Sequence, residues 1–476
     1  MKATNLCKTI RDEFESDDNI ISRQLLGNKV VLMYMEGLCD VVKVAEFVVR
    51  PIMENKPQKI TAHQLISVIQ HPNCKLIDAS TIVEEIMDGK CVLIIDNSKL
   101  HISVGVDLIK ERNITEPPTN AVLKGPREGF VENYKTNVGL LRQILADKNM
   151  GTIYMKVGKH TNTDVVIVYI NGICDKKIVD KVKSKIEKIN IDGALDSNYV
   201  TGYLEERPGS IFKQVGTSEK PDVVCAKLLE GRVAVIVDGS PIVLTVPFLL
   251  FEDIQSSDDY YSNHVHVSLL RFLRVICCLI TIMLPSLYLS VQLYHYKVLP
   301  LTFLMTIINS TQNIPFTPFM EILFVLVLFE ILYEASLRMP QYLGIALSIV
   351  GALILGDTAV EAGLISSPAV MIVALSGITL YTIPDHTPQL SMLRFGYTII
   401  GGILGFYGVI VFSIFLLIRL NDFDAYGSPY LAPYSPYIKE DTKDGMFKSH
   451  ILNMRTRPKS IRNINKVRMK REDIDK

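Results

Sequence analysis

The chain has 476 residues, enough for about three average domains. Its 50 Lys and Arg residues balance 50 Asp and Glu residues, so the net charge gives no reason to expect binding to nucleic acid. Charged and apolar residues are mixed up to His266, whereas residues 267–420 are mostly apolar, with several stretches of 19 or more uncharged residues. This distribution predicts a large soluble N-terminal region followed by a membrane domain.

The N-terminus lacks a signal peptide, because its first 20 residues contain charges throughout and no apolar core. We therefore expect the soluble region to be cytosolic. The eight cysteines show no C-x-x-C spacing, which favours a reducing compartment over disulfides or a zinc finger. His264 and His266 have no third ligand nearby, so a solvated juxtamembrane loop is favoured over a metal site. No metal or cofactor is expected.

The soluble region contains an internal repeat. VVLMYMEGLCD at 30–40 matches VVIVYINGICD at 165–175, and IMDGKCVLIIDNS at 86–98 matches LLEGRVAVIVDGS at 228–240. The order is preserved, and the near-continuous apolar runs are typical of strands buried on both faces. The sequence thus predicts two related α/β subdomains whose equivalent strands are 30–35 with 165–170, and 92–96 with 234–238. Cys39 and Cys174 occupy equivalent positions and are interpreted as core residues.

The predicted fold class is an α/β N-terminal region of two related subdomains followed by an all-α polytopic membrane domain. Helices are expected at 41–49, 62–69, 134–145 and 176–189. The expected divisions are an N-terminal extension (1–27), subdomain 1 (28–124), a connecting loop and helix (125–159), subdomain 2 (160–266), a transmembrane domain (267–420) and a basic tail (421–476).

Asp96 and Asp238 end apolar strands, where carboxylates often serve active sites. Each also begins a turn, as in the run Asp-Gly-Ser-Pro at 238–241, and the turn interpretation is favoured. The soluble region has no P-loop, dinucleotide-binding or nucleophile-elbow motif. No enzyme activity is predicted.

Several apolar segments follow. Residues 275–293 form a possible span with Pro285 in its middle, where a kink is expected. Residues 299–308 are too short to cross, 319–333 form a helix, 342–356 are marginal, and 364–383 and 395–418 are long enough. Small residues at four-residue spacing favour close helix packing or oligomerisation. They are Gly344, Ser348 and Ala352, and Gly401 and Gly405.

Two pairs of acidic residues are candidates for an ion path, because carboxylates in or beside membrane spans usually face water, a partner or an ion. Glu330 and Glu334 lie one helical turn apart, and so do Asp357 and Glu361. The alternatives are an exposed interfacial loop for Asp357 and Glu361, and a buried structural pair between Glu334 and Arg338.

The orientation of the chain follows from its positive charge. The segment from Gly445 to Arg471 contains nine Lys and Arg residues and no acid, so the tail and the N-terminal region are both expected in the cytosol. Five clear spans would place the tail outside. Either one segment is re-entrant or residues 299–308 contribute to another crossing.

The sequence resembles the A subunits of the GerA family of spore germinant receptors over about residues 25–437. The resemblance rests on an ordered series of motifs. They are GPREGF (125–130), ERP (206–208), SIF (210–212), EGRVAVIVDGSP (230–241), DYY (259–261), LPSLY (284–288), FEILYEA (329–335), ALSIVG (346–351), GD (356–357) and PYLAP (429–433). The chain departs from the family in its basic tail beyond Pro436, where an anionic lipid or a partner could bind, and at Lys213, where the family often has proline.

The resemblance implies a receptor complex in the spore inner membrane, formed with B and C subunits. In that family the B subunit is taken to sense the nutrient, and the A subunit is thought to oligomerise into a channel for monovalent cations. The alternatives are a secondary transporter of a small nutrient and a non-conducting scaffold. The membrane half shows no inverted repeat and has few spans for a transporter.

Overall fold

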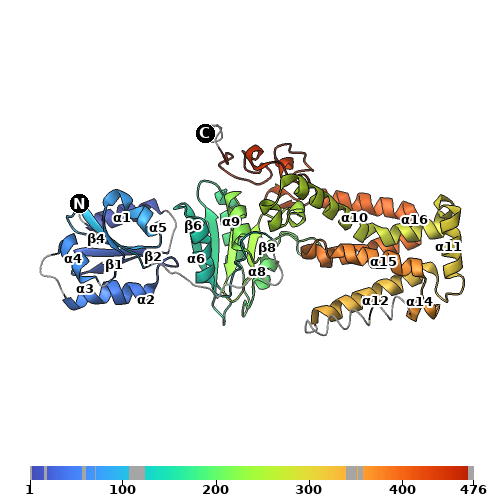
Figure 1. Cartoon of the computed structure of the whole chain (residues 1–476), viewed down its shortest axis with the longest axis horizontal. Helices are drawn as coiled ribbons and strands as arrows, with labels where there is room; N and C mark the ends of the chain where they lie inside the picture. The colour runs from blue at the N-terminus through green and yellow to red at the C-terminus, as the bar shows by residue number, and fades with distance from the viewer. Residues whose placement is uncertain are drawn as a thin grey trace.

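The computed structural model describes residues 3–14, 19–55, 60–69, 71–106, 124–338, 351 and 358–469. Two α/β subdomains are followed by a bundle of apolar helices, and the tail folds back against the junction between them (Figure 1). We call the end of the bundle that faces the subdomains the near end, and the opposite end the far end.

Subdomain 1 is a five-stranded sheet covered by helices. The strand order is β1-β2-β4-β5-β3, and every neighbouring pair is antiparallel. Its elements are α1 (Ala3–Glu13), β1 (Ile20–Leu25), β2 (Val30–Met35), α2 (Val41–Lys43), the π-helix η1 (Val44–Val49), α3 (Arg50–Asn55), α4 (Ala62–Val68), β3 (Cys74–Asp78), η2 (Ala79–Thr81), α5 (Ile82–Met87), β4 (Cys91–Ile95) and β5 (Leu100–Val104).

Subdomain 2 repeats this arrangement. Its sheet has the order β6-β7-β9-β10-β8, which is the same pattern, and its neighbouring strands are again antiparallel. Its elements are α6 (Tyr134–Ile144), β6 (Met150–Val157), β7 (Thr163–Ile170), α7 (Lys176–Glu187), α8 (Ser197–Leu204), β8 (Gly216–Ser218), α9 (Pro221–Leu229), β9 (Val233–Val237) and β10 (Val243–Val246).

The two motif pairs of the repeat lie at equivalent places. The strands β2 and β7, and β4 and β9, are the buried central strands of the two sheets. The aspartates that end the first motif, Asp40 and Asp175, both accept hydrogen bonds from the first backbone amides of the next helix. Such caps satisfy donors that have no partner within the helix, so they fix where each helix begins.

Asp96 and Asp238 also have equivalent roles, and both belong to turns as expected. The Asp96 carboxylate accepts a hydrogen bond from the backbone amide of Ala3 at the start of α1 (2.9 Å). The Asp238 carboxylate accepts one from Tyr134 at the start of α6 (3.2 Å). Both aspartates therefore tie the first helix of a repeat to the end of a central strand.

The subdomains begin earlier than the sequence boundaries of 28 and 160. β1 pairs with β2 over its whole length, and Phe14 near α1 is buried in the same core, so residues before 28 are part of subdomain 1. β6 pairs with β7 over eight residues, and α6 packs on α9, so the expected connecting segment belongs to subdomain 2. Edge strands and surface helices carry polar residues, so the apolar pattern of the sequence did not show that these segments belong to the repeat.

The helical bundle contains α10 (His264–Tyr294), α11 (Leu301–Thr311), α12 (Pro318–Arg338), α14 (Ala359–Glu361), α15 (Ser367–Leu380) and α16 (Thr387–Asn421). Within the described ranges, two helical segments have the length and composition needed to cross a membrane, His264–Tyr294 and Pro384–Asn421, although the second is interrupted at Gly405. α10 begins at His264, so the expected juxtamembrane loop there is wrong: both histidines lie in the first turn of the helix.

The expected single span 395–418 is wrong. Gly405 has non-helical backbone angles (φ 63°, ψ −152°), and α16 folds back there as a helical hairpin. The hydroxyl groups of Tyr397 and Ser413 lie 3.0 Å apart, whereas sixteen residues of continuous helix would separate them by about 24 Å. Both ends of α16 lie near Phe248 of the α/β region. The ring of His386, immediately before α16, is 6.4 Å from that of Phe248, and Leu420 belongs to the same buried cluster as Phe248.

The hairpin returns the chain to the near end, and the tail continues there. Between Asp422 and Met469 the tail contains β11 (Asp424–Ala425), β12 (Ser428–Pro429), η8 (Asp441–Lys443) and η9 (Ile451–Asn453). The amide of Ile464 donates to the carbonyl of Ile173 in subdomain 2 (2.9 Å). The tail and the α/β region therefore lie on the same side of the bundle (Figure 1), which removes the conflict over the number of spans.

Candidate functional site

Glu330 of α12 forms an ion pair inside the bundle. One carboxylate oxygen lies 3.0 Å from the Arg394 guanidinium of α16, and the other accepts a hydrogen bond from the Ser391 hydroxyl (2.8 Å). The Arg394 side chain is 2% exposed, and it also donates to the Ser376 hydroxyl of α15. The pair compensates two charges that would be costly alone in an apolar bundle, and it ties α12 to α16.

Glu334 and Glu321, on the same helix, have different surroundings. Glu334 pairs with Arg338 one turn later, as one alternative predicted, but both side chains are exposed rather than buried. Glu321 is buried, and its carboxylate accepts a hydrogen bond from the backbone amide of Ser366 just before α15 (2.5 Å). Each acid of α12 thus has a hydrogen-bond partner, and for Glu330 and Glu334 that partner is an arginine whose charge compensates the carboxylate.

Glu361 differs from them, because it is exposed at the far end of the bundle. It ends the short helix α14, whose residues Ala359 and Val360 pack against Leu289 and Ile322. No ion pair of Glu361 is found within the described part of the chain. Asp357, its predicted neighbour, lies outside the described residues, so their one-turn spacing stays a prediction.

The glycines of α16 lie where helices approach closely. A Cβ atom at Gly401 would be 2.2 Å from the Ser286 hydroxyl of α10, and one at Gly402 would meet the Phe319 ring at the same distance. Gly405 lies against the ring of Tyr294 and forms the hairpin turn rather than part of a continuous packing stripe. Pro285 is buried inside α10, and its kink stays a prediction.

Gly344, Ser348 and Ala352 of the other predicted stripe lie outside the described residues.

The start of α10 is joined to the tail by buried charges. The Arg271 guanidinium contacts the carboxylates of Asp259 (2.8 Å) and Asp444 (2.9 Å), and it donates to the Gly445 carbonyl (2.8 Å). Arg274 binds the same Asp259 carboxylate. Arg271 therefore joins α10 to the tail, and Arg274 supports this junction through the shared Asp259 carboxylate.

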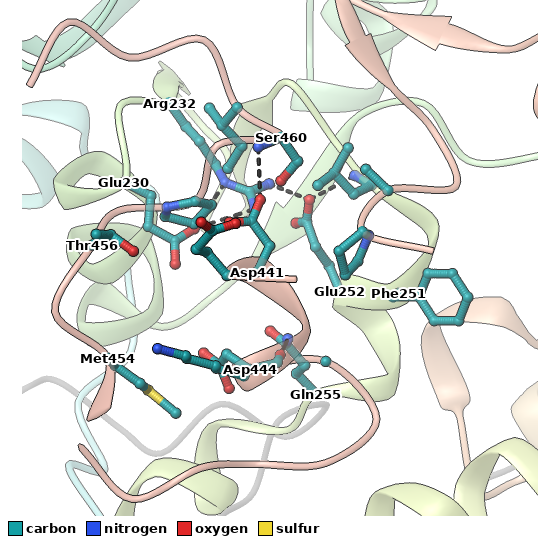
Figure 2. A pocket seen from close by; sticks show the side chains of 18 of the residues that line it. Glu230, Arg232, Phe251, Glu252, Gln255, Asp441, Asp444, Met454, Thr456 and Ser460 are labelled. Carbon is teal, nitrogen blue, oxygen red and sulfur yellow. Dashed lines mark hydrogen bonds and ion pairs between the residues drawn. The ribbon is translucent and has the colours of Figure 1, made fainter. Parts of the chain in front are cut away.

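A cavity of about 80 Å³ lies beside this junction, between subdomain 2 and the tail (Figure 2). Glu230, Arg232 and Glu252 line it from subdomain 2 and the segment that follows, and Asp441 and Asp444 line it from the tail. Burial raises the pKa of Glu230, against the opposing effect of Arg232. Burial alone would lower the pKa of Arg232, but Glu252 and Glu230 outweigh it and raise that pKa.

These charges are paired with one another and with backbone groups. Arg232 contacts Glu252 and Glu230, and the Asp441 carboxylate accepts the backbone amide of Ser460 (2.7 Å). Arg468 of the tail also pairs with Glu230 (3.5 Å), and this contact holds the tail against subdomain 2.

A second contact links subdomain 2 to the hairpin. Phe212 and Leu416 of α16 both pack against the buried cluster that contains Phe248 and Leu420. Lys213 follows Phe212, and its ammonium group pairs with Asp253 (2.9 Å). Arg207 pairs with Asp422, immediately after α16 (3.0 Å). The motifs ERP and SIF thus lie where the α/β region meets the last helix of the bundle.

Sequence reasoning missed Arg394 as the partner of Glu330 and missed the packing of the tail on subdomain 2. Arg394 lies in an otherwise apolar stretch, which could have marked it as the partner of an acid elsewhere. The tail gave no comparable signal, because many of its contacts are made by backbone groups.

The fold and the junction together define a class: a duplicated α/β region joined to an apolar helical bundle. Residues 8–460 match the model of a single family, described as Bacillus/Clostridium GerA spore germination protein. The chain belongs to this family, and the resemblance predicted from its motifs is confirmed.

Relatives match over nearly the whole chain. Spore germination protein KA of Bacillus subtilis is 33% identical over 98% of this chain and 88% of its own length. Spore germination protein A1 of the same organism is 32% identical over 97% of this chain and 96% of its own length. The crystal structure of the N-terminal domain of the A subunit of the Bacillus megaterium spore germinant receptor GerK3 is 27% identical and covers 52% of this chain and 95% of that domain, with a TM-score of 0.39.

Proposed function

We propose that this chain is the membrane subunit of a nutrient germinant receptor that triggers spore germination. The observation that carries the proposal is the family match over residues 8–460, which includes both the α/β region and the bundle. Relatives named for spore germination also cover both regions. An activity that needs the two regions together fits this match better than a role for either region alone.

The proposed location is the spore inner membrane, with the α/β region and the tail in the cytosol. The basic tail and the arginines at the start of α10 lie at the near end of the bundle. Positive charge is enriched on the cytosolic side of membrane proteins, which supports this orientation. The proposed partners are the B and C subunits of the receptor, further copies of this chain, and membrane lipid.

Within the receptor, several copies are proposed to surround a path for monovalent cations. A ring of carboxylates at a pore mouth raises the local concentration of cations and so selects them. Glu361 is the described candidate that best fits this role, because it is exposed at the far end. Glu330 and Glu334 fit less well, since arginines compensate both.

The test is cation flux through the full-length chain, purified and reconstituted in liposomes with and without the other receptor subunits. Passive K⁺ efflux that depends on this chain supports the channel. Nutrient uptake coupled to an ion gradient would instead identify a transporter, and the absence of both activities in correctly assembled complexes would identify a scaffold. No enzyme activity is proposed.

A further inference from the structure

An apolar surface remains exposed where α10 meets the tail. On α10 it consists of Leu269, which is 65% exposed, with Phe272 and Leu273. Phe447 of the tail is 60% exposed and stacks on Phe272, with ring centroids 6.3 Å apart and planes at 18°. We call these four residues the juxtamembrane patch. Exposed apolar patches of this kind mark sites that another molecule or a membrane covers.

We propose that the juxtamembrane patch is an interfacial anchor, inserted into the headgroup layer of an anionic leaflet beside α10. The proposal rests on α10 crossing the membrane, as proposed above, but not on ion conduction. It assigns the C-terminal tail a lipid-binding role at a defined point, the side chain of Phe447.

The position of the patch along α10 fits a headgroup layer. The uncharged part of α10 begins at Val275, three residues after Phe272 and six after Leu269. At a rise of about 1.5 Å per residue, these residues lie roughly 4.5 and 9 Å outside the hydrocarbon. The headgroup layer is about 5–8 Å thick on each side, and interfacial apolar side chains are typically buried about 5–10 Å into this boundary.

Phe447 is exposed although the chain around it is firmly held. Arg271 binds the carbonyl of Gly445 (2.8 Å), and the backbone amide of Lys448 donates to the Ser268 hydroxyl of α10 (2.9 Å). The Lys448 ammonium group also donates to the Asp259 carbonyl. These contacts fix the aromatic ring on the outer face of α10 rather than in the protein core.

The charge of the tail indicates an anionic lipid. Residues 445–469 contain seven Lys and Arg residues and no acid. Lys459 and Arg468 are engaged with Glu440 and Glu230. Further exposed basic side chains have no ion pair within the described part of the chain. They are Arg455, Arg462 and Lys466. These three side chains lie on the part of the tail that packs on subdomain 2 rather than beside Phe447, because Arg457 and Arg468 of the same segment contact Leu229 and Glu230. Their attraction to anionic lipid therefore acts over a distance, and it is the contribution that salt should screen.

Lipid is favoured over a second copy of the chain because the patch continues along α10. Leu279, ten residues after Leu269 and seven after Phe272, is also exposed on this helix. These spacings keep the three side chains on one face, so the patch extends the surface that would contact the acyl chains.

The chain contains no tryptophan, which allows a direct test. Full-length Phe447→Trp is reconstituted in vesicles of phosphatidylcholine alone or with phosphatidylglycerol, and its fluorescence is measured with lipids brominated near the headgroup end of the acyl chain. We expect blue-shifted emission and at least twofold quenching, stronger in anionic vesicles and weaker at high salt.

Leu452→Trp is the matched control. Leu452 is an exposed apolar residue of the same tail, two residues after His450, whose ring contacts that of His264 (5.3 Å). His264 lies eleven residues before Val275, or roughly 16 Å outside the hydrocarbon. This control should show water-exposed emission with little quenching.

Three outcomes would overturn the anchor. Water-exposed, unquenched emission from Phe447→Trp would show that lipid does not cover the patch. Blue-shifted emission that bromolipid does not quench, and that depends on protein density, would show that a second copy covers it. Equal quenching in neutral and anionic vesicles would refute the role of the basic tail. Phe272→Trp gives an independent reading should the first variant fail to fold.

Discussion

Tyr397 and Ser413 are separated by sixteen residues of α16, yet their hydroxyl groups are in hydrogen-bonding contact at 3.0 Å. The ring of Tyr397 also packs edge-on against Phe412, with centroids 4.8 Å apart. The two halves of α16 are therefore antiparallel neighbours. This arrangement returns the chain to the α/β region, where Asp422 meets Arg207 and the tail begins.

The hairpin should depend on Gly405. Its backbone angles are accessible almost only to glycine, at a cost of about 1–3 kcal/mol for other residues. A Cβ atom there would also lie 2.8 Å from the Tyr294 ring. This ring is held in place because its hydroxyl group donates hydrogen bonds to the carbonyls of Gly402 and Ile403. We expect Gly405→Ala to lower the free energy of unfolding by more than the backbone cost alone, measured by SDS titration of the reconstituted chain.

Gly363→Ala separates the two effects. Gly363 has a similar positive φ of 66°, but a Cβ atom there would meet nothing within 4 Å. We expect this control to show only a backbone cost of about 1–2 kcal/mol. Equal losses in both variants would contradict close packing of the hairpin turn against Tyr294.

The ion pair between Glu330 and Arg394 should stabilise the bundle more than the exposed pair of Glu334 and Arg338. Glu330→Gln leaves the buried guanidinium uncompensated. The expected cost is about 2–3 kcal/mol, below the range for fully buried pairs because the Glu330 side chain is 36% exposed. Glu334→Gln should cost less than about 0.5 kcal/mol.

Double-mutant cycles with Arg394→Met and Arg338→Met measure the two coupling energies directly. A coupling energy for the inner pair no larger than that for the exposed pair would show that Glu330 and Arg394 do not hold α12 against α16.

The repeat was predictable because its central strands can be recognised from their composition. A strand buried on both faces must be apolar at almost every position, so β2, β4, β7 and β9 were placed to within a residue or two. The edge strand β1 is buried only at its two ends, its polar run Ser-Arg-Gln is exposed, and it was assigned to an extension. Its place in the sheet depends on pairing with β2, which composition does not reveal.

The bundle was less predictable for a related reason. Hydropathy measures how apolar a segment is, and a hairpin of two short helices is as apolar as one long span. Only the backbone angles of Gly405 and contacts such as Tyr397 with Ser413 distinguish them. Arg394 lies immediately before the expected span 395–418, and its partner Glu330 lies 64 residues earlier in the chain, so hydropathy does not connect them.

Glu361 should control cation selectivity if several copies form a pore. Glu361→Gln, alone or with Asp357→Asn, removes the exposed carboxylate without removing any ion pair within the described part of the chain. We expect a severalfold lower permeability ratio of K⁺ to Cl⁻ in planar bilayers, with assembly unchanged. Glu334→Gln is the matched control, since that acid is exposed but paired with Arg338. If Glu361→Gln, the double variant and Glu334→Gln all have the same permeability ratio of K⁺ to Cl⁻, a ring of Glu361 carboxylates is excluded.

Subdomain 1 should lose stability in acid through Glu85 of α5. Its carboxylate contacts Lys75 of β3 (2.5 Å), Lys90 (3.1 Å) and the buried Ser103 hydroxyl of β5 (2.7 Å). Burial alone would raise the pKa of Glu85, but hydrogen bonds from these three residues outweigh it and lower the pKa below its ordinary value of 4.5. The folded state therefore favours the ionised carboxylate.

The sign of the pH effect follows from this shift. A carboxyl group with a lowered pKa in the folded state contributes stability that is fully present above its unfolded pKa and is lost as the pH falls through the folded pKa. We expect amide hydrogen exchange in β3 and β5 of the full chain, corrected for the intrinsic rate, to report a loss of about 1–3 kcal/mol between pH 6 and pH 3.

Glu85→Gln tests the assignment, because a neutral amide cannot titrate. The variant should be less stable than the natural chain at pH 6, with an exchange profile in β3 and β5 that changes less with pH. Glu54→Gln is the control: Glu54 pairs with Arg50 on the surface, with both side chains more than 60% exposed, and this pair should contribute less than about 0.5 kcal/mol. An equally steep pH dependence after Glu85→Gln would show that another carboxyl group governs the acid response of subdomain 1.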